Sequence, residues 1–261
     1  MKVGLFCHSS TGNTKLVCDY LKRNIPEIEM IDIATASKLR IEDYGIIGIA
    51  CPAFYLSIPP IMSSFLDCLS SESVKYAFLL VTYGMMQGKS ISIMGKKLTK
   101  KGFVVFEYIT LRMPESLPTF IEKGWTDIES PNTKEMTLLH RFIETVRSAI
   151  HLVESGKSPK KKRLSDGLLN SLIPIPPRSK TMKQFGNLVV DEQACTSCGA
   201  CIESCVYRAI ALDKKPYFDM DKCVACYSCF NKCPQKAIST TNSNITVQYQ
   251  KPSTNLVEKF L

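Results

Sequence analysis

Eight of the twelve cysteines of this 261-residue chain lie within 39 residues, and their spacing constrains the fold more than any other feature. They form two runs of the pattern CxxCxxCxxxC: Cys195, Cys198, Cys201 and Cys205, followed by Cys223, Cys226, Cys229 and Cys233. The first residues, MKVGLFCHSSTGNTK, give a short strand-like run and then polar residues, which is not the form of a secretion signal. We therefore expect a cytoplasmic, reducing location, where clustered cysteines indicate bound metal rather than disulfides.

The spacing within each run favours iron–sulfur clusters over zinc. Three thiolates at every third residue can wrap one face of a cubane cluster, and a fourth thiolate from a distant turn closes it. Zinc sites typically use paired CxxC knuckles about 15–20 residues apart, without the third CxxC step. The complete pattern occurs twice, and each run is followed by an Ala-Ile pair, Ala209-Ile210 and Ala237-Ile238. The two runs are therefore an internal repeat.

Over roughly 187–240 the chain resembles the bacterial two-cluster ferredoxins, in which the fourth cysteine of each run ligates the other cluster. The resemblance implies two [4Fe–4S] clusters. One is expected to be held by Cys195, Cys198, Cys201 and Cys233, and the other by Cys223, Cys226, Cys229 and Cys205. The chain departs from the pattern at Val206, where a proline usually follows the fourth cysteine, whereas Pro234 is present in the second run.

The first 156 residues alternate between apolar strand-like runs and helical patterns. The strands are expected at 2–7, 28–33, 44–51, 78–83 and 103–109, with helices after the first loop and at 59–70, 88–101 and 133–153. This alternation predicts an α/β fold with a doubly wound, five-stranded parallel sheet of order 2-1-3-4-5. The ferredoxin-like part is a smaller α+β domain. In the doubly wound fold, ligands bind at the carboxyl ends of the strands.

The loop after the first strand is suited to a phosphate group, because its hydroxyls and amides precede a helix N-terminus. It consists of Ser9, Ser10, Thr11, Gly12, Asn13 and Thr14. Neither the GxxxxGK[ST] nor the GxGxxG motif is present. Cys7 before this loop suggests a phosphatase nucleophile, but 8–14 contains no Arg or Lys to hold a transferred phosphoryl group. A buried strand cysteine is the favoured interpretation of Cys7.

The same loop matches the [ST]-x-T-G-N-T phosphate loop of the flavodoxins, and two further loops resemble theirs in position. These are Pro52, Ala53, Phe54, Tyr55 and Leu56 after the third strand, and Thr82, Tyr83, Gly84 and Gly88 after the fourth. The resemblance implies an FMN cofactor whose flat ring system lies between the two later loops, where aromatic side chains suit it. Core packing is the alternative role for Phe54, Tyr55 and Tyr83. Flavodoxins are typically acidic, whereas residues 1–156 have a net charge of only +1.

Almost all of the net charge of +9 lies in one short segment. Residues 157–183 carry eight basic side chains, one acidic side chain and four prolines, a net charge of +7. We expect a linker or wrapping segment here, joining an FMN domain at 1–156 to a two-cluster domain at 184–240 with a tail at 241–261. The linker is either a solvated tether or a docking strip for an acidic protein partner or an anionic membrane surface. Nucleic acid is disfavoured, because the strip has no interleaved aromatic residues.

Together the two resemblances point to the flavodoxin–ferredoxin fusion proteins of anaerobes. They imply electron transfer between FMN and the clusters, with partners such as ferredoxin- or flavodoxin-dependent oxidoreductases. The alternative is an FMN-dependent reductase of a small molecule, a quinone or another flavin, fed by the clusters; a third is that the clusters are structural. The sequence leaves open whether the protein is an enzyme. No run approaches the roughly 18 uncharged apolar residues of a spanning helix, so we expect no transmembrane segment.

Overall fold

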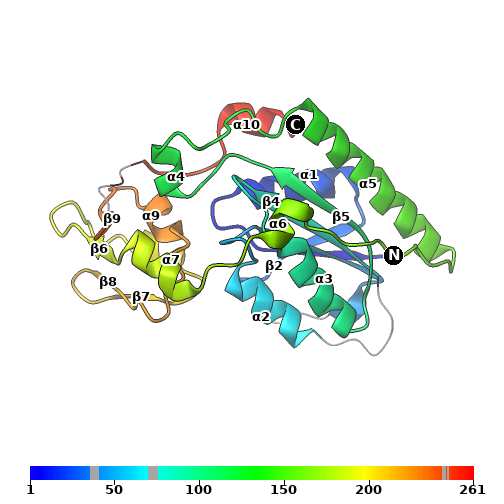
Figure 1. Cartoon of the computed structure of the whole chain (residues 1–261), viewed down its shortest axis with the longest axis horizontal. Coiled ribbons are helices and arrows are strands. Elements are labelled where there is room, and N and C mark those ends of the chain that lie inside the picture. Colours follow the sequence, from blue (N-terminus) through cyan, green and yellow to red (C-terminus); the bar gives the residue numbers. More distant parts are fainter. Residues whose placement is uncertain (36–40, 70–75, 243–244, 246) are drawn as a thin grey trace. The chain divides into compact units, whose positions relative to one another are not determined.

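The computed structural model describes residues 1–35, 41–69, 76–242, 245 and 247–261, drawn in Figure 1. The chain divides into two compact units. The first, the sheet unit, contains residues 1–114, 127–175 and 253–261. The second, the cysteine unit, contains residues 115–126 and 176–252.

The sheet unit is built on five parallel strands in the order β2-β1-β3-β4-β5. The strands are β1 (Val3–Cys7), β2 (Ile28–Asp32), β3 (Ile46–Pro52), β4 (Tyr76–Tyr83) and β5 (Val104–Arg112). Val3 of β1 pairs with Ile28 of β2 on one side and with Ile46 of β3 on the other. The predicted fold class and strand order are confirmed.

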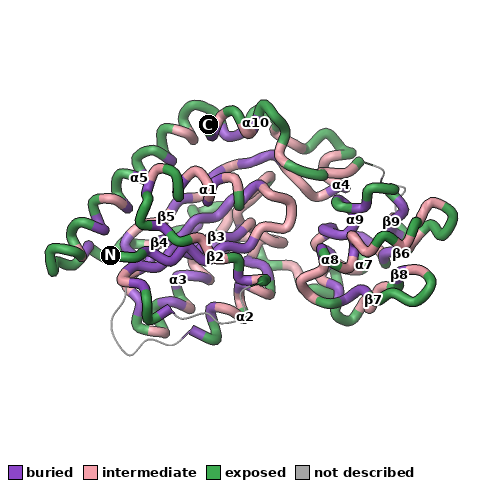
Figure 2. Tube along the Cα trace, turned by 180° about the vertical axis from the view of Figure 1, so that it is seen from behind, coloured by how far each residue is buried: buried purple, intermediate pink, exposed green. Residues whose placement is uncertain are grey.

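Helices cover both faces of this sheet and bury two separate apolar cores. One core packs the sheet against α1 (Asn13–Asn24) and α5 (Thr133–Glu154), and the other packs it against α2 (Pro60–Cys68) and α3 (Ser90–Lys100). Figure 2 shows the central strands as buried along most of their length. This double cover explains why β3 and β4 are nearly continuous apolar runs in the sequence. The last residue of the expected helix 59–70 lies outside the described residues.

Three short elements complete the sheet unit: η1 (Ile41–Asp43), α6 (Leu168–Leu172) and α10 (Thr254–Glu258). The last of these joins the core beside α1 and α5, because Leu256 and Phe260 are fully buried there. The Arg23 guanidinium of α1 donates a hydrogen bond to the Phe260 carbonyl. The final nine residues are therefore packed structure that belongs to the sheet unit.

The cysteine unit is a repeat in its backbone as well as in its sequence. Its elements are α4 (Pro118–Glu122), α7 (Arg178–Phe185), β6 (Leu188–Val190), α8 (Ala200–Glu203), β7 (Ile210–Leu212), β8 (Pro216–Phe218), α9 (Ser228–Lys232) and β9 (Ile238–Thr240). A shift of 28 residues carries the start of β6 onto β8, of α8 onto α9 and of β7 onto β9. The strands pair crosswise as two antiparallel ribbons, β6 with β9 and β7 with β8. Each half of the repeat is thus completed by a strand of the other half.

The bounds of the two units differ from the expected domains in three places. Residues 115–126 group with the cysteine unit, where the Asn231 side-chain amide donates to the Ser116 carbonyl at 3.0 Å. The expected linker, 157–183, divides after residue 175, and it contains α6 and the start of α7. Its prolines did not exclude a helix, because Pro177 stands just before α7, where a missing amide hydrogen costs nothing. The third difference is the return of 253–261 to the sheet unit.

Candidate cofactor sites

Left-handed residues recur at matching positions of the two cysteine runs. Ser197 and Ala225 both have φ of 55°, Arg208 and Lys236 both have φ of 51°, and Gly199 (81°) matches Tyr227 (56°). Five of these six are not glycine, so the backbone is held in an unfavourable conformation by its surroundings. These left-handed residues turn the chain sharply within each cysteine run.

The wrapped backbone aims amide groups at four of the cysteine sulfurs. The pairs are Ser197 N with Cys195 Sγ, Ala225 N with Cys223 Sγ and Ala209 N with Cys205 Sγ, each at 3.4 Å, and Ala237 N with Cys233 Sγ at 3.3 Å. Each pair in the first run has a counterpart 28 residues later. The same backbone geometry thus orients the cysteine side chain at four equivalent positions of the repeat, the first and the last cysteine of each run.

Two pockets gather all eight cysteines in two sets of four. The first pocket contains Cys195, Cys198, Cys201 and Cys233, and its empty volume of about 370 Å³ includes space that is open to solvent. The second contains Cys205, Cys223, Cys226 and Cys229, and its empty volume of about 340 Å³ likewise includes open space. Each pocket thus receives the last cysteine of the opposite run. These are the same two groups that the ferredoxin resemblance implies.

The exchange of the fourth cysteine follows from the crosswise strand pairing. The Asp191 amide donates to the Ala237 carbonyl at 2.7 Å, and the Asp219 amide donates to the Ala209 carbonyl at 2.8 Å. These bonds hold the start of each run against the end of the other. Within the described residues, no three His, Cys, Asp or Glu side chains lie close enough to share one metal ion. The four thiolates of a cubane bind four different irons and need not lie that close.

Each pocket contains two buried cysteines, Cys201 and Cys233 in the first and Cys223 and Cys229 in the second. The pockets differ at one pair of equivalent positions, because Cys198 is exposed whereas Cys226 is half-buried. Tyr227, which replaces the glycine of the first run, is only 2% exposed and packs edge-on against Phe185. Burial raises the pKa of the Cys226 thiol to about 11 and also raises the pKa of Cys229. In the metal-free chain these thiols are protonated, so metal binding there must release protons.

In the sheet unit, the first predicted loop leads into the N-terminus of α1. Gly12 adopts a left-handed φ of 98° just before the helix and has no side chain to cap the helix amides. The first turn of α1 contains no acidic residue. The partial positive charge of the helix end is therefore not neutralised locally, which favours an anion at this loop. The Gly12 amide donates to Ser9 Oγ at 3.2 Å, which fixes the loop itself.

Two predicted residues of this loop are occupied by contacts within the chain. The hydroxyls of Thr14 and Thr82 lie 2.8 Å apart and join the first loop to the third. The Asn13 side-chain amide donates to the Pro114 carbonyl at 3.0 Å. These two side chains therefore position the loop. Ser9, Ser10 and Thr11 are half-buried rather than fully buried.

The second and third loops are pressed against each other at the carboxyl ends of β3 and β4. Phe54 and Ser57 exchange both backbone hydrogen bonds, so Tyr55 and Leu56 form a tight turn with φ of 47° and 63°. Gly88 has a φ of 59°, and any Cβ at this position would clash with the Leu56 backbone. The Lys89 amide also donates to the Leu56 carbonyl at 2.8 Å. Only glycine fits at residue 88.

The predicted aromatic residues of these loops are not core residues. Phe54, Tyr55 and Tyr83 are all half-buried, and the rings of Phe54 and Tyr55 meet edge-to-face at 4.5 Å. Burial, together with the nearby Glu135 carboxylate, raises the pKa of Tyr83, so its phenol stays neutral. Half-exposed rings on two adjacent loops are able to stack against a flat ligand. Pro52 and Ala53 lie at the end of β3, where the Ala53 amide donates to the Thr82 carbonyl at 2.7 Å.

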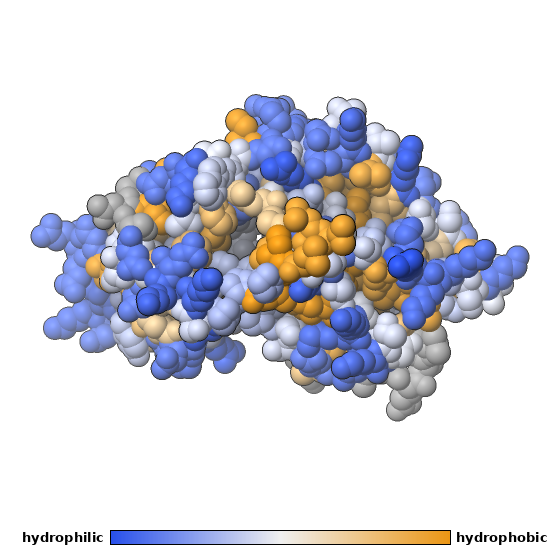
Figure 3. Space-filling view, in the orientation of Figure 1, coloured by the Kyte–Doolittle hydropathy of each residue, from blue (hydrophilic) through white to orange (hydrophobic). Residues whose placement is uncertain are grey.

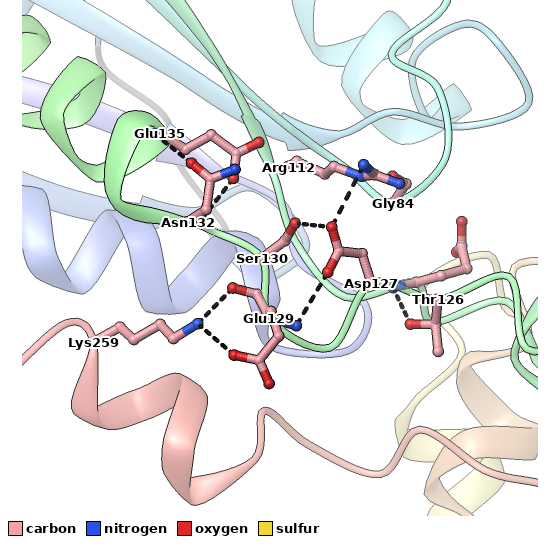
Figure 4. A network of polar contacts seen from close by, with 10 residues as sticks. Gly84, Arg112, Thr126, Asp127, Glu129, Ser130, Asn132, Glu135 and Lys259 are labelled. Atoms are coloured by element: carbon pink, nitrogen blue, oxygen red, sulfur yellow. Dashed lines mark hydrogen bonds and ion pairs between the residues drawn. The ribbon is translucent and has the colours of Figure 1, made fainter.

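Sequence reasoning missed two residues that support the third loop. Asp166, the one acidic residue of 157–183, is buried and accepts hydrogen bonds from the Ile91 and Ser92 amides, which caps α3 from outside the helix. Arg112 donates to the Gly84 carbonyl at 3.1 Å and pairs with Asp127 at 3.5 Å, as Figure 4 shows. A single acid among eight basic residues was the available signal for Asp166. Nothing in the local sequence marks Arg112.

The comparison with protein families identifies the cysteine unit. Residues 194–237 match the 4Fe-4S dicluster domain. Two [4Fe–4S] clusters are therefore the cofactors of this unit, as the cysteine spacing predicts. A search of curated protein sequences gives no match to the chain.

The solved structures that are similar to this chain include two flavodoxins. A flavodoxin from the domain Archaea is 17% identical, over 58% of this chain and 99% of that chain, with a TM-score of 0.45. Rubredoxin oxygen:oxidoreductase from Desulfovibrio gigas is 15% identical, over 57% of this chain and 36% of that chain, with a TM-score of 0.43. A flavodoxin of Streptococcus pneumonia TIGR4 is 12% identical, over 57% and 99%, with a TM-score of 0.44. Similarity of this extent does not identify a ligand, so the cofactor of the sheet unit is inferred from its own strand order and loops.

Proposed function

We propose that this chain is an electron-transfer protein that carries FMN in its sheet unit and exchanges electrons between FMN and the two [4Fe–4S] clusters of its cysteine unit. The observation that carries the proposal is the sorting of eight cysteines into two pockets, each completed by the last cysteine of the other run. That sorting matches the ligand exchange of two-cluster ferredoxins. Clusters held in this way serve electron transfer, and a second redox cofactor on the same chain gives them an exchange partner.

The proposed cluster ligands are the cysteines that line each pocket. Cys195, Cys198, Cys201 and Cys233 hold one cluster, and Cys205, Cys223, Cys226 and Cys229 hold the other. The donor set fits the group, because thiolates are the usual ligands of [4Fe–4S] clusters. With the clusters bound, the four amide-to-sulfur hydrogen bonds would contribute to setting the cluster potentials.

FMN fits the carboxyl edge of the sheet through three contributions of this chain. The N-terminus of α1 and the half-buried hydroxyls of 9–11 suit a phosphate. The half-exposed rings of Phe54, Tyr55 and Tyr83 suit the flat ring system. The hydrogen bond between Thr14 and Thr82, the clash-limited position of Gly88 and the Arg112–Gly84 contact hold the loops in place. This is the position at which folds of this strand order bind ligands.

When bound, FMN exchanges one or two electrons, whereas a cluster exchanges one at a time. A chain with both therefore matches a two-electron donor or acceptor to one-electron carriers. The residues of this chain orient the cofactors and set their potentials. We expect the external partners to be redox proteins.

Reduction kinetics test the relay. In anaerobic stopped-flow experiments, the clusters and the flavin absorb at different wavelengths, so each can be followed after mixing with a reduced ferredoxin. We expect both cofactors to become reduced, with flavin reduction lost when a pocket cysteine such as Cys198 is replaced by serine. Clusters that stay oxidised while the flavin is reduced at an unchanged rate would contradict the relay and favour structural clusters. Fast turnover of a quinone without any protein partner would favour the small-molecule reductase instead.

A further inference from the structure

The short helix α6 and the residues after it present an exposed apolar surface on the sheet unit. Leu168 is 81% exposed, Leu169 is 67% exposed and Leu172 is 72% exposed, and Ile175 follows at 40%. Figure 3 shows this apolar patch over α6. Single exposed leucines are ordinary on protein surfaces, but a group of adjacent ones marks an interaction site.

The chain immediately before α6 is exposed and positively charged. Lys157, Lys160, Lys161 and Arg163 are all exposed. The acidic residue of the segment, Asp166, is buried with its carboxylate on the amides of α3, so it does not offset these charges at the surface. The exposed side chains of 157–175 are therefore basic, apolar or uncharged. We call this segment the basic–leucine surface.

The basic–leucine surface is attached firmly to the sheet unit. The Lys162 amide donates to the Val105 carbonyl of β5 at 2.9 Å, and the Leu164 side chain packs so closely on Gly95 of α3 that a Cβ there would clash. Asn170 of α6 accepts a hydrogen bond from the Gly88 amide at 3.2 Å. A free tether would make none of these contacts. The exposed leucines are held outward by a folded support.

We propose that the basic–leucine surface binds the headgroup region of an anionic lipid bilayer, with the leucines of α6 inserted and the lysines and Arg163 on lipid phosphates. Composition decides between lipid and protein. Protein–protein interfaces are depleted in lysine, and their energetic centres are rich in Trp, Tyr and Arg but poor in leucine. Leucine beside clustered lysine is the composition of interfacial membrane anchors, which combine apolar insertion with attraction to anionic lipid.

The attachment is peripheral. In the part of the chain that the structure describes, no helix is both long and apolar enough to span a bilayer. A single short apolar element gives weak binding, and stable anchoring requires a second signal such as a polybasic patch. Here the second signal is supplied by the residues that precede α6. Binding of this kind requires no cofactor, so it stands or falls independently of the proposed electron transfer.

Vesicle flotation with the full chain tests the proposal. The chain is expected to float with phosphatidylcholine vesicles that contain phosphatidylglycerol and to remain unbound with pure phosphatidylcholine. The variant K160Q/K161Q/R163Q should bind the anionic vesicles roughly a hundredfold more weakly, because each basic residue contributes about a factor of five. The variant L168S/L169S/L172S should bind at least tenfold more weakly. The matched controls are K22Q/K100Q/K134Q and L138S, which change exposed residues elsewhere on the sheet unit.

Several outcomes would overturn the proposal. They are no flotation with either kind of vesicle, equal flotation with both, or equal losses in the control variants. Unchanged thermal transitions in every variant show that a loss of binding is not a loss of folding. Slower electron exchange with an acidic redox protein in the two surface variants, without any vesicle binding, would identify the surface as a protein-docking site.

Discussion

The two units of this chain differ in what fills their interiors. The sheet unit buries two apolar cores that contain none of the eight cluster cysteines. In the cysteine unit, many of the buried residues are the cysteines themselves or their neighbours, including Cys201, Cys223, Cys229 and Cys233 with Ala225, Tyr227, Phe230 and Ala237. A unit of this size with little core of its own needs a metal group to hold it together. The sheet unit is therefore expected to fold without the proposed FMN, whereas the cysteine unit is expected to depend on its clusters.

Removal of the clusters should therefore produce the largest difference in stability between the two units. After treatment with oxidant and chelator, we expect the thermal transition of the cysteine unit to disappear and that of the sheet unit to remain. Differential scanning calorimetry, with hydrogen exchange to assign the transitions, measures this. Removal of FMN should leave both transitions in place. An intact transition in the iron-free cysteine unit would show that its apolar contacts are sufficient to keep it folded without the clusters.

Exchange of single cysteines tests the crosswise pockets. C205S should lose the cluster held mainly by the second run, and C233S should lose the cluster held mainly by the first. In each variant we expect iron to fall from about eight to about four per chain. Electron paramagnetic resonance of the reduced protein should then show one cluster without spin coupling to another. C68S serves as the control, because Cys68 is exposed and lies far along the chain from both runs. Loss of both clusters in either variant would mean that the pockets do not fill independently.

The C-terminal residues provide a cofactor-free test of the sheet unit. Phe260 is fully buried in the core with α1 and α5, so F260A should lower the free energy of unfolding by about 3–5 kcal/mol. The neighbouring Leu261 is 83% exposed, and L261A should have almost no effect. Denaturant unfolding of the sheet unit measures both. Similar stability of the two variants would show that residues 253–261 do not contribute to the core of this unit.

Flavin affinity should depend on the packing between the second and third loops. G88A places a Cβ against the Leu56 backbone and is expected to weaken FMN binding at least tenfold, as measured by fluorescence titration. G102A is the matched control: Gly102 also has a positive φ, of 85°, but a Cβ at this position would have no neighbour within 4 Å. Both variants carry the backbone strain of alanine at positive φ, so only the clash differs between them. Equal affinity in the two variants would exclude the loop contact as a determinant of the FMN site.

The smallest expected effect concerns Asp127. Its hydrogen bond from Ser130 lowers the pKa of the carboxyl group, and Arg112 contributes in the same direction. Because the pKa is lower in the folded chain, this carboxylate stabilises the fold above its unfolded pKa, and the contribution is lost as the pH falls through the folded value. D127N should lower the free energy of unfolding by less than about 1 kcal/mol at neutral pH, since both side chains of the pair are partly exposed to solvent. The difference in the free energy of unfolding between D127N and the wild type should vanish in acid. A difference that grows in acid would contradict a lowered pKa for Asp127.

The sequence predicts local features of this chain well and distant contacts poorly. The strands were predictable because buried parallel strands are continuous apolar runs, and the repeat was predictable because the CxxCxxCxxxC spacing occurs twice. The two sets of four cysteines were implied by the resemblance to two-cluster ferredoxins. The capping of α3 by Asp166 joins residues more than 70 positions apart, and no local pattern encodes it. The same holds for Phe260 in the core of the sheet unit and for Asn231 on Ser116. Such contacts depend on the completed fold.

The most direct test of the central claim is the cofactor content of the chain after strictly anaerobic purification. Absorbance spectra with iron, sulfide and flavin quantification should give about eight irons and about eight sulfides per chain, together with about one FMN. An iron content below about four per chain, or no FMN, would contradict the account of one chain that holds both kinds of redox cofactor.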